Sequence, residues 1–369
     1  MDWIRDSLEK TEKKLEAEAG RMGEKIPYIA ENGRYEKDMR DENLSWWTNG
    51  FWAGMMWQMY HASGKELFKE AACKTEKTLD RALENYEGLH HDVGFMWMHT
   101  AAADYRLTGN PLSRKRALHV ANLLAGRFNY AGKFIRAWNL DKTGWMIVDC
   151  MMNLSLLYWA SEETGDPRYA QIADMHADTA MKEVMRPDGS CNHIVVFDPE
   201  TGAVTEKTGG QGYGEGSAWS RGQAWALYGF ALAFLHTGRE EYLDTAKRAA
   251  HYFIANIAMT DHVSLSDFRA PEEPVVWDTT AAACAACGLL QIAEMVPELE
   301  QGLYRFHGEK ILKRLTETHC CWDEVKDGIL QYGTAAYHRK EDTHVPIIYG
   351  DYFLTEGLLR LAGKGFMIW

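Results

Sequence analysis

Two aspartates in largely apolar surroundings are the first candidates for chemistry. Asp92 follows a pair of histidines in the segment LHHDVGFM, residues 89–96, and Asp149 lies in the apolar segment WMIVDCMM, residues 145–152. A carboxylate buried without a partner is usually paired, protonated or catalytic. Desolvation and a nearby like charge raise the pKa of a carboxyl group by several units, and a helix dipole worth about 0.3 to 1 kcal/mol does not offset this. We therefore predict that Asp149 holds a proton near neutral pH and acts as general acid, while Asp92 stays ionised and orients substrate or water.

The histidines beside Asp92 raise the question of a metal site. Two imidazoles and a carboxylate are zinc ligands, but the adjacent side chains of His90 and His91 point in different directions, and no second ligand pair in the sequence matches them. We therefore expect no metal and assign Asp92 to catalysis or substrate binding. Cys284 and Cys287 lie in an Ala-rich helical segment without a second cysteine pair, which indicates helix packing.

One arginine stands out in an otherwise acidic protein. The segment SAWSRGQAW, residues 217–225, supplies Arg221 together with one Gln and two Trp where a helix is expected to begin. A guanidinium binds a carboxylate through two parallel hydrogen bonds, which makes Arg221 a docking point for an anionic group. The alternative is an ion pair between Arg221 and an aspartate at another helix start.

The Gly-rich stretch 209–216 lacks the strand and helix of a dinucleotide site, so we predict a flexible loop across the mouth of a cavity.

The chain repeats a helical hairpin that would position these groups. Four apolar segments end in a small residue and a glycine, and the four glycines are Gly64, Gly109, Gly165 and Gly238. Glycine suits the left-handed C-cap that ends one helix and lets the next begin. The first segment of each pair is apolar nearly all round, as in residues 224–232, whereas the second has the spacing of a surface helix, as in 169–177. One layer of helices therefore lies inside another.

Buried helices start at six places, near Asn49, Asp92, Asp149, Arg221, Asp278 and Asp351. Six inner helices paired with six outer ones predict an all-α fold, an (α/α)6 barrel in which each hairpin buries its face on its neighbours. The inner helices then all point one way, so the residues at their starts gather at one end of the central cavity. Capping is the alternative role for Asp278 and Asp351, because Asp is a good N-cap. The clearest strand signal, residues 194–197, predicts a small hairpin in a long loop.

Composition and charge limit the partners. The 369 residues include 40 Lys and Arg against 53 Asp and Glu, a net charge of -13 without a long basic run, which argues against nucleic acid. The first residues lack the basic and apolar regions of a signal peptide, and no stretch approaches the about 18 apolar residues of a membrane span, so we expect a cytoplasmic protein. Seven scattered cysteines suit reduced thiols. Without a linker or a shift in composition, residues 1–369 are predicted to form a single domain.

Six sets of strings along residues 45–362 carry a resemblance to a known family. They are WTNGFWAG (47–54), HHDVGF (90–95), VDC (148–150), WSRGQAW with YGF (219–225 and 228–230), ACGLL (286–290) and GDYF (350–353). Together they resemble the unsaturated glucuronyl hydrolases, glycoside hydrolase family 88. The resemblance implies an (α/α)6 barrel, in agreement with the six helix starts.

The resemblance also implies an unusual reaction. Members of the family act on oligosaccharides left by polysaccharide lyases, whose non-reducing end is a Δ4,5-unsaturated uronic acid. An acid protonates C4 of the vinyl ether, water adds at C5, and the hemiketal collapses with loss of the bond to the next sugar. The separation of carboxylates that distinguishes ordinary glycosidases therefore does not apply.

Carried over residue by residue, the resemblance makes Asp149 the general acid/base and Asp92 its partner carboxylate. It implies substrate contacts for Trp47, His91, Trp138, His193, Gln211, Trp219, Arg221 and Trp225. We expect a hydrolase of unsaturated uronyl oligosaccharides, glycosaminoglycan disaccharides first among them, with no metal or nucleotide cofactor, acting as a monomer or homodimer. The alternatives are an unsaturated rhamnogalacturonyl hydrolase acting on pectin fragments, a sugar epimerase on the same barrel with histidines as acid and base, and a non-catalytic sugar-binding protein.

Overall fold

The computed structural model describes residues 2–369, and most of them lie in helices. The helices are α1 (Asp2–Met22), α2 (Met39–Glu42), α3 (Phe51–Ser63), α4 (Glu66–Leu79), α5 (Val93–Trp97), α6 (Ala103–Thr108), α7 (Pro111–Ala125), α8 (Cys150–Thr164), α9 (Arg168–Glu183), α10 (Ser220–Thr237), α11 (Glu240–Ile257), α12 (Thr279–Met295), α13 (Glu298–Thr318) and α14 (Ile348–Leu361). A 3-10 turn at Trp47–Gly50 leads into α3, and a π-helical stretch at Met98–Ala102 joins α5 to α6.

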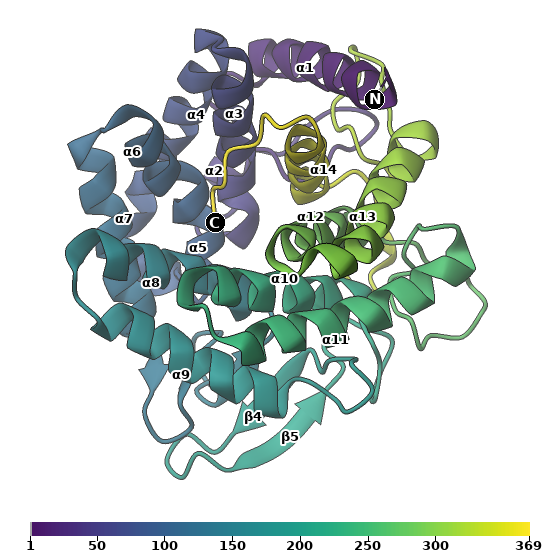
Figure 1. The fold of residues 1–369 in the computed structure, drawn as a ribbon. Helices are drawn as coiled ribbons and strands as arrows, with labels where there is room; N and C mark the ends of the chain where they lie inside the picture. Colours follow the sequence, from purple (N-terminus) through teal and green to yellow (C-terminus); the bar gives the residue numbers. More distant parts are fainter. Residues whose placement is uncertain (1) are drawn as a thin grey trace.

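Six inner helical segments form a closed ring: α3, α5 with α6, α8, α10, α12 and α14 (Figure 1). Each contacts the next, and α14 contacts α3, which closes the circle. The helices α4, α7, α9, α11 and α13 pack outside the inner helices that they follow in the chain, and α1 takes the sixth outer place against α14. The predicted (α/α)6 barrel is confirmed.

Burial separates the two layers as the sequence predicts. In the inner helix α12 every residue from Thr279 to Ala293 is buried. The outer helix α11 instead buries one stripe, which includes Tyr242, Ala246 and Phe253. An all-round apolar helix needs neighbours on every side, whereas an amphipathic one needs a single apolar face covered.

The four predicted hairpin glycines each end a helix in the left-handed conformation. Their φ angles are 71° at Gly64, 76° at Gly109, 70° at Gly165 and 68° at Gly238, and each caps the C-terminus of an inner helix. A residue with a Cβ pays strain at such angles, so glycine is the favoured C-cap. The sequence signal for these turns is confirmed.

Helix starts lie where the sequence places them. Asp92, Asp149 and Asp278 directly precede α5, α8 and α12, while Arg221 is the second residue of α10. Capping is confirmed for Asp278, whose carboxylate accepts the N–H of Thr280. It is wrong for Asp351, which lies inside the first turn of α14 and accepts the backbone N–H groups of Ile329 and Leu330 instead, at 2.9 and 2.7 Å.

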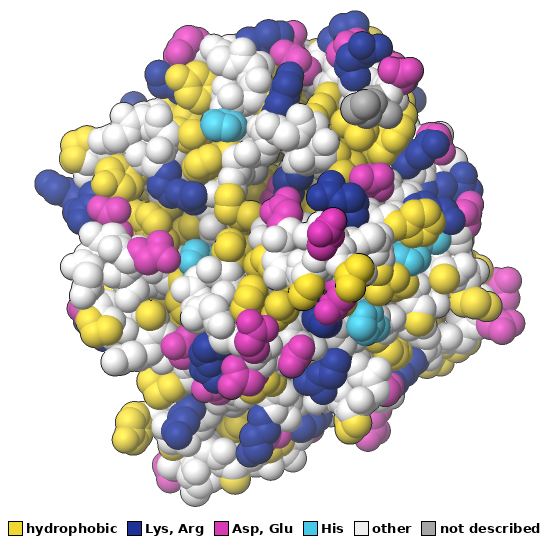
Figure 2. All heavy atoms as spheres, viewed as in Figure 1, with side chains coloured by type: hydrophobic (Ala, Val, Ile, Leu, Met, Phe, Trp, Pro, Cys, Tyr) yellow, Lys and Arg dark blue, Asp and Glu magenta, His cyan; other side chains and the backbone are white. Residues whose placement is uncertain are grey.

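The C-terminal segment closes the barrel at the C-terminal ends of the inner helices. Gln58 of α3 bonds both backbone polar groups of Phe366, Arg106 of α6 donates to the carbonyl of Ile368, and Trp369 donates to Glu356 of α14. The chain end accordingly lies in the middle of the ring in Figure 1. Figure 2, drawn from the same side, shows atoms filling this end of the barrel and acidic and basic side chains interspersed over it. The helix starts that carry the candidate residues lie at the opposite end.

Within residues 2–369, seven short strands lie in the loops. They are β1 (Phe128–Asn129), β2 (Phe134–Ile135), β3 (Trp145–Ile147), β4 (Ile194–Phe197), β5 (Val204–Thr208), β6 (Gly333–Thr334) and β7 (Thr343–Val345). The predicted strand at 194–197 is confirmed as β4, and the hairpin it forms with β5 is extended by β3 into an antiparallel three-stranded sheet of order β3-β4-β5. β3 was not predicted, because three residues carry too little alternation to be recognised.

The cysteines and the hydropathy of the helices bear on two further expectations. All seven cysteines are free thiols, and four of them are buried. Among residues 2–369, no helix combines the length and the apolar character that crossing a bilayer requires.

A buried acidic cluster beneath α1 affects stability. Glu18 of α1 is fully buried, its Oε1 accepts the N–H of Gly328 at 2.9 Å, and its Oε2 has no hydrogen-bond partner among the described residues. Burial raises the pKa of Glu18 well above its ordinary value, and the charge of Asp351 adds to the rise. The folded state therefore binds more protons than the unfolded state, and the free energy of unfolding falls as pH rises above the ordinary Glu pKa.

We expect Glu18→Gln to stabilise the protein at pH 8, because the amide keeps the Oε1 acceptor and removes a buried charge. The gain in the free energy of unfolding should be about 1 kcal/mol or more. It should shrink at pH 5, where the glutamate of the wild type is protonated. Urea unfolding at pH 8 and pH 5 measures the gain and its reduction. Glu9→Gln, on the exposed side of the same helix, is the control. A loss of stability at pH 8 would contradict the prediction.

Candidate active site

The small sheet brings three predicted site residues together. Strand β3 pairs Ile147 with Ile194 of β4, and one step further the N–H of Val148 donates to the carbonyl of His193 at 3.1 Å. Asp149 follows directly, and its Oδ2 lies 3.5 Å from His193 Nε2. On the other side, β5 leads into Gln211, whose N–H donates to His193 Nδ1 at 2.9 Å. The three strand ends thus place the candidate acid, the histidine and the glutamine side by side.

The hydrogen bond from the Gln211 N–H determines which nitrogen of His193 carries the proton. Because Nδ1 accepts the Gln211 N–H, the neutral ring carries its own proton on Nε2, the nitrogen that faces Asp149. The approach of the loop requires glycine at position 210, where φ is 56° and a Cβ would lie 2.0 Å from His193 Nδ1. Glycine at position 210 therefore keeps the Nε2–H of His193 facing Asp149.

Asp149 differs from the other aspartates at helix starts in what its carboxylate binds. It precedes α8 but makes no capping bond, and among residues 2–369 its buried Oδ2 has no hydrogen-bond partner within bonding geometry. Its side chain retains 15% exposure. Asp278 and Asp351, in contrast, are fully buried and bonded through both oxygens. Asp149 therefore has an oxygen free for chemistry.

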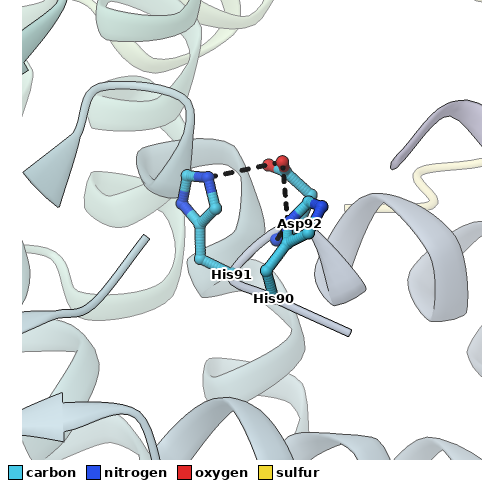
Figure 3. Close-up of side chains that lie close together, drawn as sticks. All are labelled: His90, His91 and Asp92. Atoms are coloured by element: carbon cyan, nitrogen blue, oxygen red, sulfur yellow. Dashed lines mark hydrogen bonds and ion pairs between the residues drawn. The ribbon is translucent and has the colours of Figure 1, made fainter. Parts of the chain in front are cut away.

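Asp92 lies among hydrogen-bond donors. Figure 3 shows its carboxylate between the rings of His90 and His91, and Oδ2 lies 3.3 Å from His90 Nδ1 and 3.3 Å from His91 Nε2. Its Oδ1 accepts from Asn153 at 3.0 Å. Burial alone would raise the pKa of Asp92, but the imidazoles of His91 and His90 outweigh it and hold this pKa well below its usual range. An ionised Asp92 is what the sequence analysis expects.

The same three side chains have the composition of a cation site. One ligand atom from each of His90, His91 and Asp92 lies within 4.8 Å of the others, close enough to surround one metal ion. The adjacent histidines thus point toward a common centre, contrary to the expectation that they diverge. That centre is the Asp92 carboxylate, whose Oδ2 lies 3.3 Å from a nitrogen of each ring.

Arg221 forms an ion pair with an aspartate at another helix start, which was the alternative to binding an anionic ligand. Its guanidinium is 1% exposed and donates to Asp278 Oδ2 at 2.7 Å, and its two terminal nitrogens also bind the carbonyls of Thr334 and Ala335. It stacks over the ring of Trp219, 4.4 Å from the centroid. Trp219 in turn lies 4.1 Å from the ring of His193. The arginine therefore reaches the site through Trp219, and its terminal nitrogens are already bonded within the protein.

The remaining predicted aromatics fall into two places. Trp47 and Trp225 meet edge to face at 6.4 Å in a cluster with Phe95 and Tyr349, and Trp225 is fully buried. Trp138 is half exposed and stacks near Trp145, apart from the others. It is tied to the site through the backbone, since His91 N–H donates to the carbonyl of the neighbouring residue 137.

The Gly-rich stretch 209–216 is held at several points. Gln211 Nε2 donates to the carbonyl of Ala335 at 2.8 Å, and Asp267 accepts the N–H groups of Tyr213 and Ala218 at 2.9 and 3.0 Å. Asp267 was not predicted, because nothing near it in sequence marks it as a loop anchor. Asn153 was also missed, although an amide four residues after Asp149 in an apolar helix is a visible signal.

Known proteins resemble this chain over most of its length. A sequence model of Glycosyl Hydrolase Family 88 matches residues 20–277. The chain is similar to the unsaturated glucuronyl hydrolase of Bacillus sp. strain GL1, with 35% identity over 354 residues that cover 92% of each protein. It is also similar to the unsaturated chondroitin disaccharide hydrolase of Streptococcus pneumoniae, with 34% identity over 332 residues, 88% of this chain and 83% of that protein.

A solved structure extends the likeness to three dimensions. A variant of the unsaturated glucuronyl hydrolase of Streptococcus agalactiae, complexed with dGlcA-GalNAc6S, gives a TM-score of 0.86 at 29% identity. The match covers 99% of this chain and 93% of that one. The likeness therefore extends over nearly the whole chain.

Proposed function

The chain belongs to glycoside hydrolase family 88, and we propose that it releases Δ4,5-unsaturated uronic acid from the non-reducing end of lyase-generated oligosaccharides, with glycosaminoglycan disaccharides as its substrates. The observation that carries the proposal is Asp149, whose unbonded Oδ2 faces the Nε2–H of His193 beside an ionised Asp92. Sugar binding alone does not need a partly desolvated carboxyl group with an oxygen left free.

In the proposed reaction Asp149 gives its proton to C4 of the vinyl ether, and the positive charge that develops at C5 is shared with the ring oxygen. Water adds at C5 and loses a proton to the Asp149 carboxylate, which restores the acid. The hemiketal opens to a ketone at C5, and the hemiacetal left at C1 releases the attached sugar. Every proton taken up is returned, and one water is consumed.

The neighbouring groups have supporting roles in this proposal. The Nε2–H of His193 stabilises the Asp149 carboxylate after it has given up its proton. The negative charge of Asp92 orients the substrate or the water and favours the positive charge at C5. The part-buried Trp47 offers a ring face to the uronic acid and is held in place by the buried Trp225, and the half-exposed Trp138 offers a ring face to the sugar beyond the cleaved bond.

Ultraviolet absorbance tests the function, because the C4=C5 bond is conjugated with the carboxylate and hydration destroys it. We expect unsaturated chondroitin and hyaluronan disaccharides to lose this absorbance and to yield the free second sugar. Persistent absorbance with both would contradict the substrate class. If pectin-derived unsaturated disaccharides then react, the rhamnogalacturonyl activity is the correct one, while solvent proton exchange without bond cleavage would indicate the epimerase.

We further propose that residues 1–369 are one catalytic domain that acts in the cytoplasm as a monomer or homodimer and needs no metal or nucleotide. The single domain is supported by the ring, which helices from both ends of the chain complete. The compartment is supported by seven free thiols, which persist where disulfides do not form.

A further inference from the structure

One side chain touches the supports of both candidate carboxylates. Asn153, fully buried in the first turns of α8, donates from Nδ2 to Asp92 Oδ1 at 3.0 Å and to the backbone carbonyl of Asp149 at 3.1 Å. Its Oδ1 accepts the N–H of Phe95, in the first turn of α5, at 2.7 Å. All of its amide bonds therefore go to the two helix starts that carry the aspartates.

We propose that Asn153 is the positioning residue that sets the two catalytic aspartates in register. Helices α5 and α8 belong to different hairpins, so no covalent turn fixes the start of one against the start of the other. The amide supplies that link, because its acceptor holds the first turn of α5 and its donor holds Asp92 and the start of α8. This inference rests on the proposed function, since it gives Asn153 a role in the same reaction.

The packing around the amide leaves it a single position. A Cβ at Gly94 would lie 2.6 Å from the Cα and from the Oδ1 of Asn153, so glycine is required where α5 crosses α8. The donor bonds also decide the orientation of the amide, because its NH2 group must face the carboxylate oxygen and its oxygen must face the Phe95 N–H. Asn153 is therefore a rigid spacer between the two hairpins.

Asn153→Ala removes the link while creating only a small cavity. We expect kcat for the unsaturated disaccharide to fall about 100-fold, the effect of a misplacement near 1 Å, while KM changes little. A general loss of folding would lower the active fraction equally at every pH, whereas a positioning defect shows in kcat of the folded protein.

Asn153→Asp provides a conditional rescue. When protonated, its carboxyl group can still accept from Phe95 and donate an O–H to Asp92, as the amide does. When ionised, it places a third carboxylate against Asp92. The pKa of the introduced group is raised by burial and by its acidic neighbours. We therefore expect the kcat of Asn153→Asp, divided by the wild-type kcat at the same pH, to rise at least fivefold from pH 8 to pH 5. The corresponding ratio for Asn153→Ala should stay constant.

Other charges bear on this titration and are the same in all variants. The titratable and charged groups on the elements around the amide include Asp149 and Cys150 at the start of α8, His90, His91 and Asp92 before α5, His193 before β4, Arg127 after α7, His176 of α9 and Arg221 of α10. Expressing each rate relative to wild type at the same pH cancels their contribution. Asn122→Asp, on the exposed side of the outer helix α7, controls for one added negative charge and should match wild type at both pH values.

Unfolding measurements test the placement without turnover. The destabilisation caused by Asn153→Asp should shrink from pH 8 to pH 5, because the folded state takes up a proton that the unfolded state does not. If the wild type converts no unsaturated uronyl substrate, the proposed function fails, and this pH dependence still tests where the amide lies. Equal kcat ratios for the two variants at both pH values, or near wild-type kcat in Asn153→Ala, would overturn the positioning role.

Discussion

Asp149→Asn should lower kcat for an unsaturated disaccharide by about 1,000-fold, the contribution of a well-placed general acid. The amide has nearly the shape of the carboxyl group but cannot give a proton to C4. Binding should persist, because the aromatic groups and Asp92 are unchanged. The comparison of initial rates of absorbance loss measures the effect, and equilibrium binding of the unreacted disaccharide to the variant measures the retained affinity.

The fold should tolerate this change, since no described residue depends on the Asp149 carboxylate for a hydrogen bond. The free energy of unfolding of the variant should therefore stay within about 0.5 kcal/mol of wild type. Asp141→Asn, at an exposed aspartate in the loop before β3, makes the same change of charge away from the site and should keep full activity. An Asp149→Asn enzyme with more than a tenth of wild-type kcat would withdraw the assignment of the acid.

The largest expected effect on stability comes from the pair formed by Arg221 and Asp278. Their side chains are 1% and 0% exposed, so removing either partner leaves the other charge buried and unpaired. We expect Arg221→Met and Asp278→Asn each to lower the free energy of unfolding by about 3–5 kcal/mol. Urea unfolding at neutral pH measures both losses.

The double variant shows whether pairing is the cause. Arg221→Met combined with Asp278→Asn removes both charges, so its loss should be smaller than the sum of the two single losses. Strict additivity would mean that the two residues act independently, which the 2.7 Å contact between Nη1 and Oδ2 contradicts. Lys310→Met, on the outer helix α13, is a control for the loss of one cation.

Sequence reasoning succeeded where the signal is local. A glycine C-cap, an apolar run and an Asp before a helix are each visible within a few residues, and together they predicted the ring and its six starts. The same pattern presents Asp149 and Asp278 alike, although one carboxylate is free and the other is bonded to Arg221. Their difference arises from contacts across the barrel that no local pattern encodes.

The missed residues have the same explanation. Asn153 is polar in an apolar helix, but the sequence alone does not say whether its amide meets water, a backbone group or a carboxylate. His90 and His91 were expected to diverge because they are neighbours, yet the turn before α5 directs both rings to Asp92. The individual roles assigned to the site residues remain predictions that the proposed variants test.

The closure of the ring by α1 and α14 has a consequence for biosynthesis. The second and third hairpins, which carry Asp92 and Asp149, leave the ribosome early, but α3 and α12 each lack a neighbour until α14 has emerged. The nascent chain therefore keeps an apolar flank of α3 uncovered until α14 is made, which is the kind of surface that aggregates or that chaperones bind.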